Sequence, residues 1–430
     1  MLKLKGSIKI SGDKSISHRA LIFASLCTGQ VKISNLLESD DVMRTLNILQ
    51  ELGIKIKKKN GSWHVNGNGT GGFIQPSQAL QCGNSGTTSR LMIGAVSSNP
   101  ISCTFIGDKS LSNRSMSRLS VHLEKIGAEI ELTNKDYLPL RIKGNVNLIP
   151  MEHVMEKASA QVKSALIFSA LNLKGKTKII EKRNTRDHTE KMMNYLKIKF
   201  KKKILTKNST SIELEGPYEI KPRNIIVASD PSSAAFFIVG ALIIPKSNII
   251  LKDIALNKTR IEFINVLRRM GGKIKVKKTK TLSGEDVGNI EVSHSILNGV
   301  KISASSSPYL IDEYPIISIA ATQAKGTTTM NGLSELRHKE SDRIKSITTN
   351  LSKLGFQATS RKDNISIKGS KNIKITNPIK IITYGDHRIA MSFSILGLLY
   401  KNNLVIDNES CISISYPDFK KHLEKLSNLY

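Results

Sequence analysis

The sequence has few aromatic residues, few cysteines and no long apolar run. Aromatic residues make up only 5% of the 430 residues, so few side chains are available to stack on the bases of a nucleic acid. The four cysteines, Cys27, Cys82, Cys103 and Cys411, form no Cys-x-x-Cys pair, which excludes a patterned zinc site or disulfide framework and indicates free thiols. No stretch approaches about 18 apolar residues, so we expect no membrane span.

A secretory leader is also missing from the pattern of the first residues. The segment MLKLKGSIKISGDK has neither an apolar stretch nor a small-residue cleavage site, and we therefore expect a cytoplasmic location. A hydrophobic content of 39% and a charged content of 23% are typical of a globular protein, and the length predicts two or three domains.

Acidic residues are scarce, with 35 against 65 lysines and arginines, which gives a net charge of +30. Much of the excess lies in three lysine tracts, Lys55–Lys59, Lys199–Lys203 and Lys273–Lys280. A basic nucleic-acid-binding protein is one interpretation. Because aromatic residues are rare, we favour a lysine-rich composition together with an anionic small-molecule substrate, and no nucleic-acid partner.

An internal repeat organises the chain. Six segments each combine a small or polar opening with a short apolar helix, and the openings start at Gly12, Gly83, Ala158, Ser229, Ile311 and Gly385. Successive starts are 71, 75, 71, 82 and 74 residues apart, a regularity that indicates six copies of one structural unit.

Each apolar helix is followed by an amphipathic one, with short β-rich pieces between them. We expect the amphipathic helices at 40–52, 116–126, 186–196, 259–270, 340–354 and 417–426. Each repeat therefore reads as a βαβαββ module, in an α/β (α+β) fold of two similar domains with three modules each. The apolar helices must be buried, so their polar N-termini should emerge together and attract anions.

The segment Leu333–Leu351 shows the pattern most clearly. Ile344, Ile347 and Leu351 recur at helical spacing, and Ser341 is the predicted N-cap. Lys339, Glu340 and Arg343 would then lie at a helix N-terminus, where backbone N–H groups point outward.

The other openings carry side chains suited to an anionic, oxygen-rich ligand. Lys14, Ser15 and Arg19 offer cations and a hydroxyl, and Gly83–Arg90 is a glycine-bearing turn without the Walker A spacing. Hydroxyl and amide groups at Ser159 and Gln161 suit neutral sugar-like oxygens.

Carboxylates and further arginines complete this set. Asp312 and Glu313 are adjacent, and either could serve as a base or simply cap a helix. Arg388 lies at a helix start, where a cation opposes the dipole and therefore indicates a ligand. Arg114 and Arg186 each lie near the start of an expected amphipathic helix.

These motifs together resemble the 5-enolpyruvylshikimate-3-phosphate synthase family. The resemblance runs from Lys14 to Asp418 and rests on GDKSISHRALI, CGNSGTTSRLM, SAQVKSA, TRDHTE, LIDEYP, ELRHKESDR and YGDHRIAM. It implies an inside-out α/β barrel architecture with buried parallel helices. One domain would comprise residues 1–11 and 228–430, and the other residues 12–227. The crossings would lie near Ser11–Gly12 and Val227–Ser229, and the active site in the cleft between the domains.

The resemblance implies transfer of the enolpyruvyl group of phosphoenolpyruvate to the 5-hydroxyl of shikimate 3-phosphate, through a tetrahedral intermediate and with release of phosphate. The implied ligands of shikimate 3-phosphate are Lys14, Ser15, Arg19, Ser159, Ala160, Gln161, Arg186, Asp312 and Lys339. The implied ligands of phosphoenolpyruvate are Lys14, Asn84, Gly86, Arg114, Gln161, Arg343 and Arg388. Asp312, Glu340 and Lys14 are the implied acid–base groups. No metal or cofactor is implied, and we expect a monomer.

Three positions depart from, or bear on, the family pattern. Ser115 follows Arg114 where the family usually has proline, which predicts a more mobile loop. Ile414 stands where many members have a lysine that touches phosphoenolpyruvate. Gly86 is the position that glyphosate-insensitive relatives replace with alanine, so the resemblance implies a glyphosate-sensitive enzyme.

A second enolpyruvyl transferase family, which acts on UDP-N-acetylglucosamine, shares the modules and the donor. It uses a catalytic cysteine on the loop where this chain has Arg114, and a Lys-Asn pair where this chain has Lys14 and Ser15. Cys103 precedes that loop and is expected in a strand, so we treat this family as the alternative.

Overall fold

The structure is a computed structural model that describes residues 2–400 and 403–427. The chain divides into two compact units. Unit 1 comprises Met1–Ser11, Ala228–Thr281 and Asp286–Tyr430, and unit 2 comprises Gly12–Val227 and Leu282–Glu285. Among the helices of the described residues, none is both long and apolar enough to span a bilayer.

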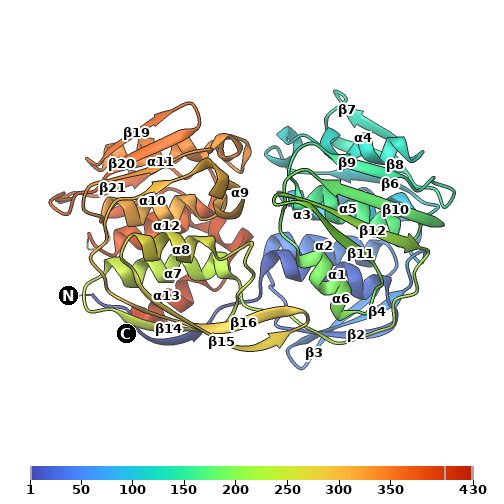
Figure 1. The fold of residues 1–430 in the computed structure, drawn as a ribbon, viewed down its shortest axis with the longest axis horizontal. Coiled ribbons are helices and arrows are strands. Elements are labelled where there is room, and N and C mark those ends of the chain that lie inside the picture. Colours follow the sequence, from blue (N-terminus) through green and yellow to red (C-terminus); the bar gives the residue numbers. More distant parts are fainter. Residues whose placement is uncertain (1, 401–402, 428–430) are drawn as a thin grey trace. The chain divides into compact units, whose positions relative to one another are not determined.

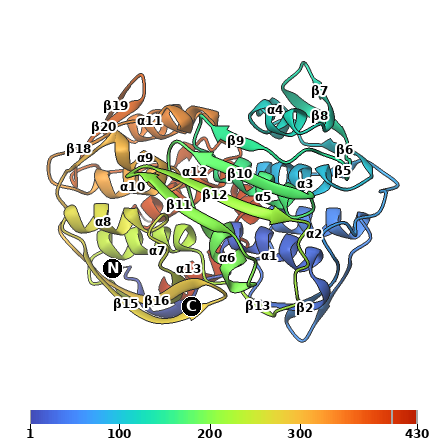
Figure 2. The same cartoon turned by 45° about the vertical axis from the view of Figure 1, so that its right-hand side comes forward.

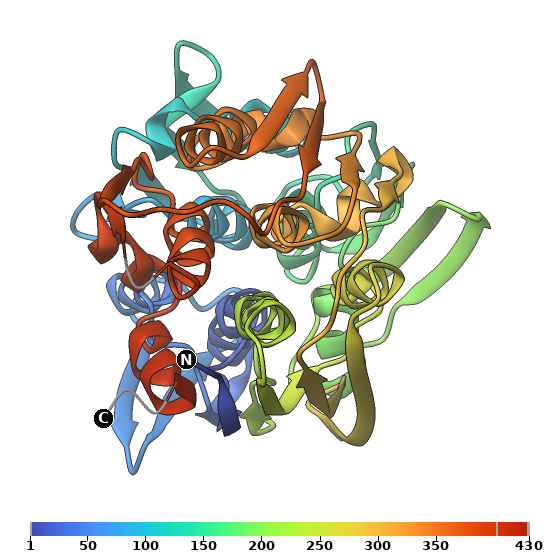
Figure 3. The ribbon, with the colours of Figure 1, turned by 90° about the vertical axis from the view of Figure 1, so that its left-hand side faces the viewer.

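Three inner helices form the centre of each unit. In unit 2 these are α1 (Lys14–Leu26), α3 (Gly86–Ser97) and α5 (Ala160–Ala170), and in unit 1 they are α7 (Pro231–Ile243), α10 (Tyr314–Thr322) and α12 (His387–Gly397). Figure 1 labels all six, and Figure 3 shows those of unit 1 nearly end-on, with strands and other helices around them. Their burial on nearly all sides confirms the prediction from their uniformly apolar sequences.

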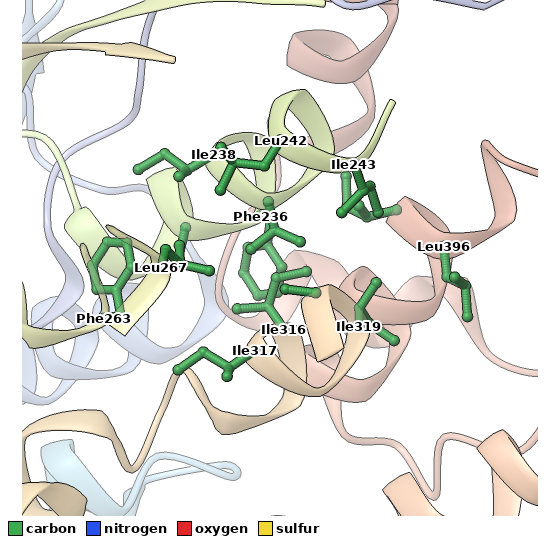
Figure 4. Close-up of a cluster of buried hydrophobic side chains, with 14 of the residues drawn as sticks. Phe236, Ile238, Leu242, Ile243, Phe263, Leu267, Ile316, Ile317, Ile319 and Leu396 are labelled. Carbon is green, nitrogen blue, oxygen red and sulfur yellow. The ribbon is translucent and has the colours of Figure 1, made fainter. Parts of the chain in front are cut away.

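The core of unit 1 shows how these helices pack. Phe236 and Leu242 on α7 lie in one buried cluster with Ile316 on α10 and Leu396 on α12 (Figure 4). Every residue of α7 is buried, so this helix can lie only at the centre of a unit.

Six amphipathic helices cover the outside of the units. They are α2 (Asp40–Glu51), α4 (Ser117–Lys125), α6 (His188–Tyr195), α8 (Glu262–Arg269), α11 (Arg343–Lys353) and α13 (Phe419–Ser427). Each overlaps one of the predicted amphipathic helices and begins up to three residues later, since helix ends depend on capping contacts that periodicity does not reveal.

The prediction that Ser341 is the N-cap of α11 is wrong. The N-cap residue is Asp342, whose carboxylate accepts from the Lys345 backbone N–H at 3.1 Å, while the Ser341 hydroxyl donates to Asp386 at 3.1 Å. Lys339 and Glu340 therefore precede the helix, after a short 3₁₀ helix over Ser334–His338. Of the three charged residues predicted at this N-terminus, only Arg343 lies in the first turn of α11.

Short sheets surround the inner helices. In unit 2 the strand orders are β13-β2-β4-β3, β5-β6-β8-β7 and β11-β12-β10-β9, the last lying beside α5 (Figure 2). These strands are β2 (Thr28–Ser34), β3 (Lys55–Lys59), β4 (Ser62–Asn68), β5 (Leu80–Gln81), β6 (Ser102–Ile106), β7 (Glu129–Thr133), β8 (Tyr137–Lys143), β9 (Glu152–Met155), β10 (Gly175–Glu181), β11 (Lys201–Thr206), β12 (Ser209–Gly216) and β13 (Ile225–Ile226).

Unit 1 has the orders β1-β14-β16-β15, β17-β18-β20-β19 and β21-β22. The strands are β1 (Lys5–Lys9), β14 (Asn248–Ala255), β15 (Lys273–Leu282), β16 (Glu285–Ser293), β17 (Lys301–Ile302), β18 (Thr327–Met330), β19 (Gln357–Arg361), β20 (Asn364–Lys368), β21 (Ile379–Ile381) and β22 (Leu404–Ile406). The four-stranded sheets show the pairing expected of a βαβαββ module. Within the described residues the sixth module has two strands and then α13, in place of a closing hairpin.

In two modules the first strand comes from a segment that is distant in sequence. The N-terminal strand β1 pairs in parallel with β14 of unit 1, and β13, at the end of the unit 2 segment, pairs in parallel with β2 at its beginning. Strand pairing therefore holds the N-terminal segment in unit 1 and joins the end of the Gly12–Val227 segment to its beginning in unit 2.

The lysine tracts have a common place in these sheets. Strands β3, β11 and β15 carry them, and each is the outermost strand of its sheet. Charged side chains, lysine above all, on a sheet edge disfavour pairing with another chain. The tracts of both units therefore have a structural explanation that involves no ligand.

Candidate functional site

The opening of α1 places two cations of unit 2. Asp13 caps the helix by accepting from the Ile16 N–H at 2.8 Å. Lys14 Nζ lies 2.9 Å from Asp41 Oδ2, and both side chains are largely buried. The position of Lys14 at a helix N-terminus opposes the helix dipole, and Asp41 supplies a carboxylate partner for its charge.

Arg19 ties α1 to α5 and α6. Its side chain is 3% exposed and donates to Thr189 Oγ1 at 2.7 Å, to Ser164 Oγ at 2.8 Å and to the Ser15 carbonyl at 2.9 Å. The predicted residues Ser15 and Arg19 therefore lie together at the start of α1.

The opening of α3 meets the opening of α5. Ser85 caps α3 and Gly86 is its first residue. From α5, Gln161 donates its amide to Thr87 Oγ1 at 2.9 Å and accepts from Arg90 Nη1 at 2.9 Å. Two predicted segments that are far apart in sequence are thus joined by side-chain hydrogen bonds.

Arg90 is a further candidate residue, whose role the sequence patterns did not predict. Its guanidinium also donates to the Ser115 carbonyl at 2.9 Å. Burial, together with the positive charges of Arg114 and Arg118, lowers the pKa of Arg90 to about 10. The available signal was its spacing, because residues four apart share one face of a helix and Gly86 is four residues earlier.

Arg114 approaches the same opening from the loop before α4. Its Nη2 donates to Asn84 Oδ1 at 2.7 Å and to Ser110 Oγ at 3.2 Å. Its buried Nε has no hydrogen-bond partner among the described residues. Asn84, Gly86 and Arg114, all predicted for one ligand, therefore lie close together in unit 2.

The remaining predicted residues of unit 2 frame the opening of α5. Ser159 caps the helix and accepts from the Val162 N–H at 3.3 Å, and Ala160 is its first residue. Arg186 is half-buried in the segment before α6.

In unit 1 a single buried arginine gathers three carboxylates. Arg343 is 1% exposed. Its Nε lies 2.8 Å from Asp386 Oδ2, its Nη2 lies 2.6 Å from Glu340 Oε2, and its Nη1 lies 3.6 Å from Asp312 Oδ1. Burial by itself would lower the pKa of Arg343, but the charges of Asp386, Glu340 and Asp312 outweigh it and raise the pKa.

Arg388 shares Asp312 with that cluster. Its Nε lies 3.6 Å from Asp312 Oδ1, and its Nη1 donates to the Asp312 carbonyl at 3.0 Å. A cation and a carboxylate from two helix openings of unit 1 therefore lie side by side.

The two adjacent carboxylates, Asp312 and Glu313, differ in their exposure to solvent. The Asp312 side chain is 18% exposed, whereas Glu313 is 1% exposed and accepts a short hydrogen bond from Ser232 Oγ. Asp312 is therefore the carboxylate that a ligand can reach. Lys339 is half-buried before α11, and Ile414 is half-buried at the end of a 3₁₀ helix over Glu409–Ile414.

Each unit thus presents converging helix N-termini with buried or half-buried cations. Such openings bind phosphates and carboxylates through backbone N–H groups and arginine forks. Over residues 2–400 and 403–427 no cluster of three or more histidine, cysteine or acidic side chains is arranged to hold a metal ion.

Cys103 does not have the environment of a reactive thiol. It lies in β6 and is buried, and burial raises the pKa of its thiol to about 12. A thiol of this kind stays protonated at neutral pH and is a poor nucleophile. The alternative that requires a catalytic cysteine finds no support at this position.

Comparison with known proteins identifies the family. Residues 1–423 match the family model described as EPSP synthase (3-phosphoshikimate 1-carboxyvinyltransferase). A 3-phosphoshikimate 1-carboxyvinyltransferase of Petrotoga mobilis is 42% identical over 429 residues, covering 99% of this chain and 98% of the relative. One from Sphingopyxis alaskensis is 40% identical over 428 residues, covering 98% and 96%.

A solved structure gives the same result for the fold. The EPSP synthase of Acinetobacter baumannii superposes with a TM-score of 0.87 at 35% identity, covering 99% of this chain and 96% of that one. With the match of the family model along nearly the whole sequence, this shows that the chain belongs to the EPSP synthase (3-phosphoshikimate 1-carboxyvinyltransferase) family.

Proposed function

We propose that the side chains gathered in the two units hold the two substrates of the family reaction. In that reaction the enolpyruvyl group of phosphoenolpyruvate is transferred to shikimate 3-phosphate. As a member of this family the chain is a transferase of the shikimate pathway, which leads to chorismate and the aromatic amino acids.

One set of proposed ligands lies in unit 2. Shikimate 3-phosphate would contact Lys14, Ser15, Arg19, Ser159, Ala160, Gln161 and Arg186. Phosphoenolpyruvate would contact Lys14, Asn84, Gly86, Arg114 and Gln161. Support comes from the hydrogen bonds that bring the openings of α1, α3 and α5 together.

The other set of proposed ligands lies in unit 1. Asp312 and Lys339 would hold shikimate 3-phosphate, while Arg343 and Arg388 would hold phosphoenolpyruvate. The observation that carries the proposal is the meeting of Arg343 and Arg388 at the partly exposed carboxylate of Asp312. A base placed beside the cations of one substrate is positioned to act on the other.

Charge explains why so many cations are needed. Each substrate carries a phosphate and a carboxylate, about −3 in charge if the phosphate contributes up to −2. Two such anions repel each other unless cations surround them, and fixed cations also stabilise charge that moves during the reaction. Holding the reactants in contact then supplies much of the rate enhancement.

The proposed chemistry is an addition followed by an elimination. The 5-hydroxyl oxygen of shikimate 3-phosphate adds to C2 of phosphoenolpyruvate while C3 gains a proton, which gives a tetrahedral intermediate. Phosphate then leaves as the new methyl group loses a proton. Asp312 would accept the hydroxyl proton, and Glu340 and Lys14 are the groups proposed for proton transfer at C3.

An assay of phosphate release from phosphoenolpyruvate plus shikimate 3-phosphate tests the proposal. Lys14→Ala, Asp312→Ala and Arg388→Ala should each remove most of the turnover while thermal unfolding stays cooperative. Lys58→Ala is a matched control, because Lys58 pairs with Glu38 on the surface. Full turnover in the three site variants, or release with UDP-N-acetylglucosamine as acceptor, would contradict the assignment.

Location and assembly belong to the same proposal. The bacterial relatives are biosynthetic enzymes, which supports a cytoplasmic enzyme. We also propose that it acts as a monomer without nucleic acid, which light scattering with and without added DNA would test.

A further inference from the structure

One residue of the β7–β8 turn holds the chain directly after Arg114. Asp136 Oδ1 accepts from Ser115 Oγ at 2.6 Å and from the Ser117 backbone N–H at 3.0 Å. The Asp136 carbonyl accepts from the Met116 backbone N–H at 2.7 Å. Three consecutive residues, Ser115 to Ser117, are therefore bound to Asp136, and we call this set of hydrogen bonds the Asp136 clasp.

The turn that carries Asp136 has little freedom of its own. Asn134 and Lys135, the two residues before it, have φ values of 50° and 60°, and strands β7 and β8 pair on either side. A turn anchored by two paired strands can fix the position of a loop that it contacts. The mobility predicted for the loop at Ser115 stays a prediction, but the serine has a definite partner.

The Asp136 clasp is linked directly to Arg90 of α3 and to Arg114 of the neighbouring loop. The Ser115 carbonyl accepts from Arg90 Nη2 at 2.9 Å, and the amide nitrogen of Ser115 is bonded to Arg114 itself. Arg114 in turn reaches Asn84 Oδ1 at 2.7 Å. Movement of Ser115 would therefore shift a hydrogen-bond acceptor of one arginine and the backbone of the other.

The negative charge of Asp136 strengthens the clasp. Although desolvation raises the pKa of Asp136, hydrogen bonds from Ser115 and Ser117 lower it overall, so the carboxylate is ionised at neutral pH. Hydrogen bonds to an ionised acceptor are about twice as strong as those between neutral groups. The nearby arginines meet mostly neutral oxygens, so Asp136 also supplies a fixed negative charge near them.

We propose that Asp136 and Ser115 are positioning residues: they hold Arg90 and Arg114 in the positions in which these arginines meet the phosphoenolpyruvate anion. The inference rests on the proposed function, because it takes Arg114 as a ligand of that substrate. Neither residue touches the substrate in this account. Both act through the backbone of the Arg114 loop.

The experiment compares Ser115→Ala, Ser115→Thr and Asp136→Asn in steady-state kinetics with each substrate varied in turn. Removing the clasp should raise the KM for phosphoenolpyruvate about tenfold, as expected for a misplaced charged contact, and leave the KM for shikimate 3-phosphate within about twofold. Ser115→Thr retains the hydroxyl and should behave like the wild type. A role in folding alone would not separate the two KM values in this way.

Matched controls remove similar groups outside the clasp. Ser112→Ala removes a hydroxyl of the same loop that donates to the Gly107 carbonyl at 3.4 Å. Glu129→Gln removes a carboxylate of β7 that pairs with Lys143 on the surface. Both should leave the two KM values unchanged.

Arg114→Ala, measured alongside, separates two kinds of failure. If Arg114→Ala raises the KM for phosphoenolpyruvate while Ser115→Ala and Asp136→Asn leave it within twofold, the clasp is overturned and the proposed ligand remains. If Arg114→Ala also has no effect, both the ligand assignment and the clasp are overturned. An equal rise in both KM values, with a lower melting temperature, would also overturn the positioning role.

Discussion

Arg343, which is buried in unit 1, and Arg90, which is half-buried in unit 2, have opposite electrostatic environments. Arg343 contacts three carboxylates, from Asp386, Glu340 and Asp312, and its pKa is raised. Arg90 donates to a side-chain amide and to backbone carbonyls, lies near Arg114, and its pKa is lowered to about 10. Carboxylates therefore balance the positive charge of Arg343, whereas the hydrogen-bond partners of Arg90 are neutral oxygens.

The difference indicates how each arginine would respond to a bound anion. In unit 1 the carboxylates hold Arg343 in place before any ligand arrives, so its geometry is preorganised. In unit 2 Arg90 donates to neutral oxygens, so an incoming anion would offset the unfavourable charge of its guanidinium as it binds. Anion binding should therefore stabilise the charge of Arg90 more than that of Arg343, which the ion pairs with Asp386 and Glu340 already stabilise.

The largest effect is expected when the ion-pair cluster of unit 1 is broken. Arg343→Met would leave Asp386, which is fully buried, without its cation. Removing one partner of a buried ion pair costs about 3–5 kcal/mol of stability, and turnover should be lost as well. Chemical denaturation and the phosphate-release assay measure the two effects.

A double variant gives the control for this prediction. Adding Asp386→Asn to Arg343→Met removes the unpaired charge and should recover part of the stability but none of the turnover. A single Arg343→Met variant as stable as the wild type would mean that the cluster is not the stabilising feature of this region.

Next in size is the matching change in unit 2. Arg90→Met leaves no carboxylate unpaired and removes a cation that burial disfavours, so the stability should change by about 1 kcal/mol or less. The KM for phosphoenolpyruvate should rise by about tenfold or more, because a charge-assisted contact is lost. A loss of stability as large as that of Arg343→Met would end the contrast between the two arginines.

Gly86→Ala should have a smaller effect on the same cation. A Cβ at residue 86 would lie 2.8 Å from Arg90 Nη1 and 3.5 Å from Arg114 Nη1, so Arg90 must move away from the helix opening. We expect turnover to persist with a KM for phosphoenolpyruvate raised a few-fold, and inhibition by glyphosate to need about tenfold more compound. Inhibition curves for the wild type and the variant test this, and wild-type activity that persists in millimolar glyphosate would contradict the expected sensitivity.

The smallest effect on activity is expected from the lysine tracts, which occur on edge strands of both units. Lys201→Thr with Lys203→Thr would leave Ile204, which is 79% exposed, on a β11 edge with less charge. Turnover should not change, but the variant should self-associate more at high concentration, as light scattering would detect. Glu129→Thr with Glu131→Thr, on edge strand β7, tests whether charge of the other sign protects an edge equally.

The sequence predicted those parts of the site that local patterns encode. Apolar runs and polar openings recur at nearly constant spacing, so the six inner helices and most candidate residues at their starts could be found without a structure. Patterns failed where a contact comes from elsewhere in the chain. Ser341 has the side chain of an N-cap but donates to Asp386, and Arg90 shows its role only beside Gln161 and the Arg114 loop.

The sequence alone determined the repeat, the two kinds of helix in each module, and the surplus of positive charge at the helix openings. Only the tertiary structure decided that Asp312 is partly exposed while Glu313 is buried, and which arginine has carboxylate neighbours. The physical reason is that helix periodicity depends on residues three or four positions apart, whereas burial and ion pairing depend on segments that folding brings together.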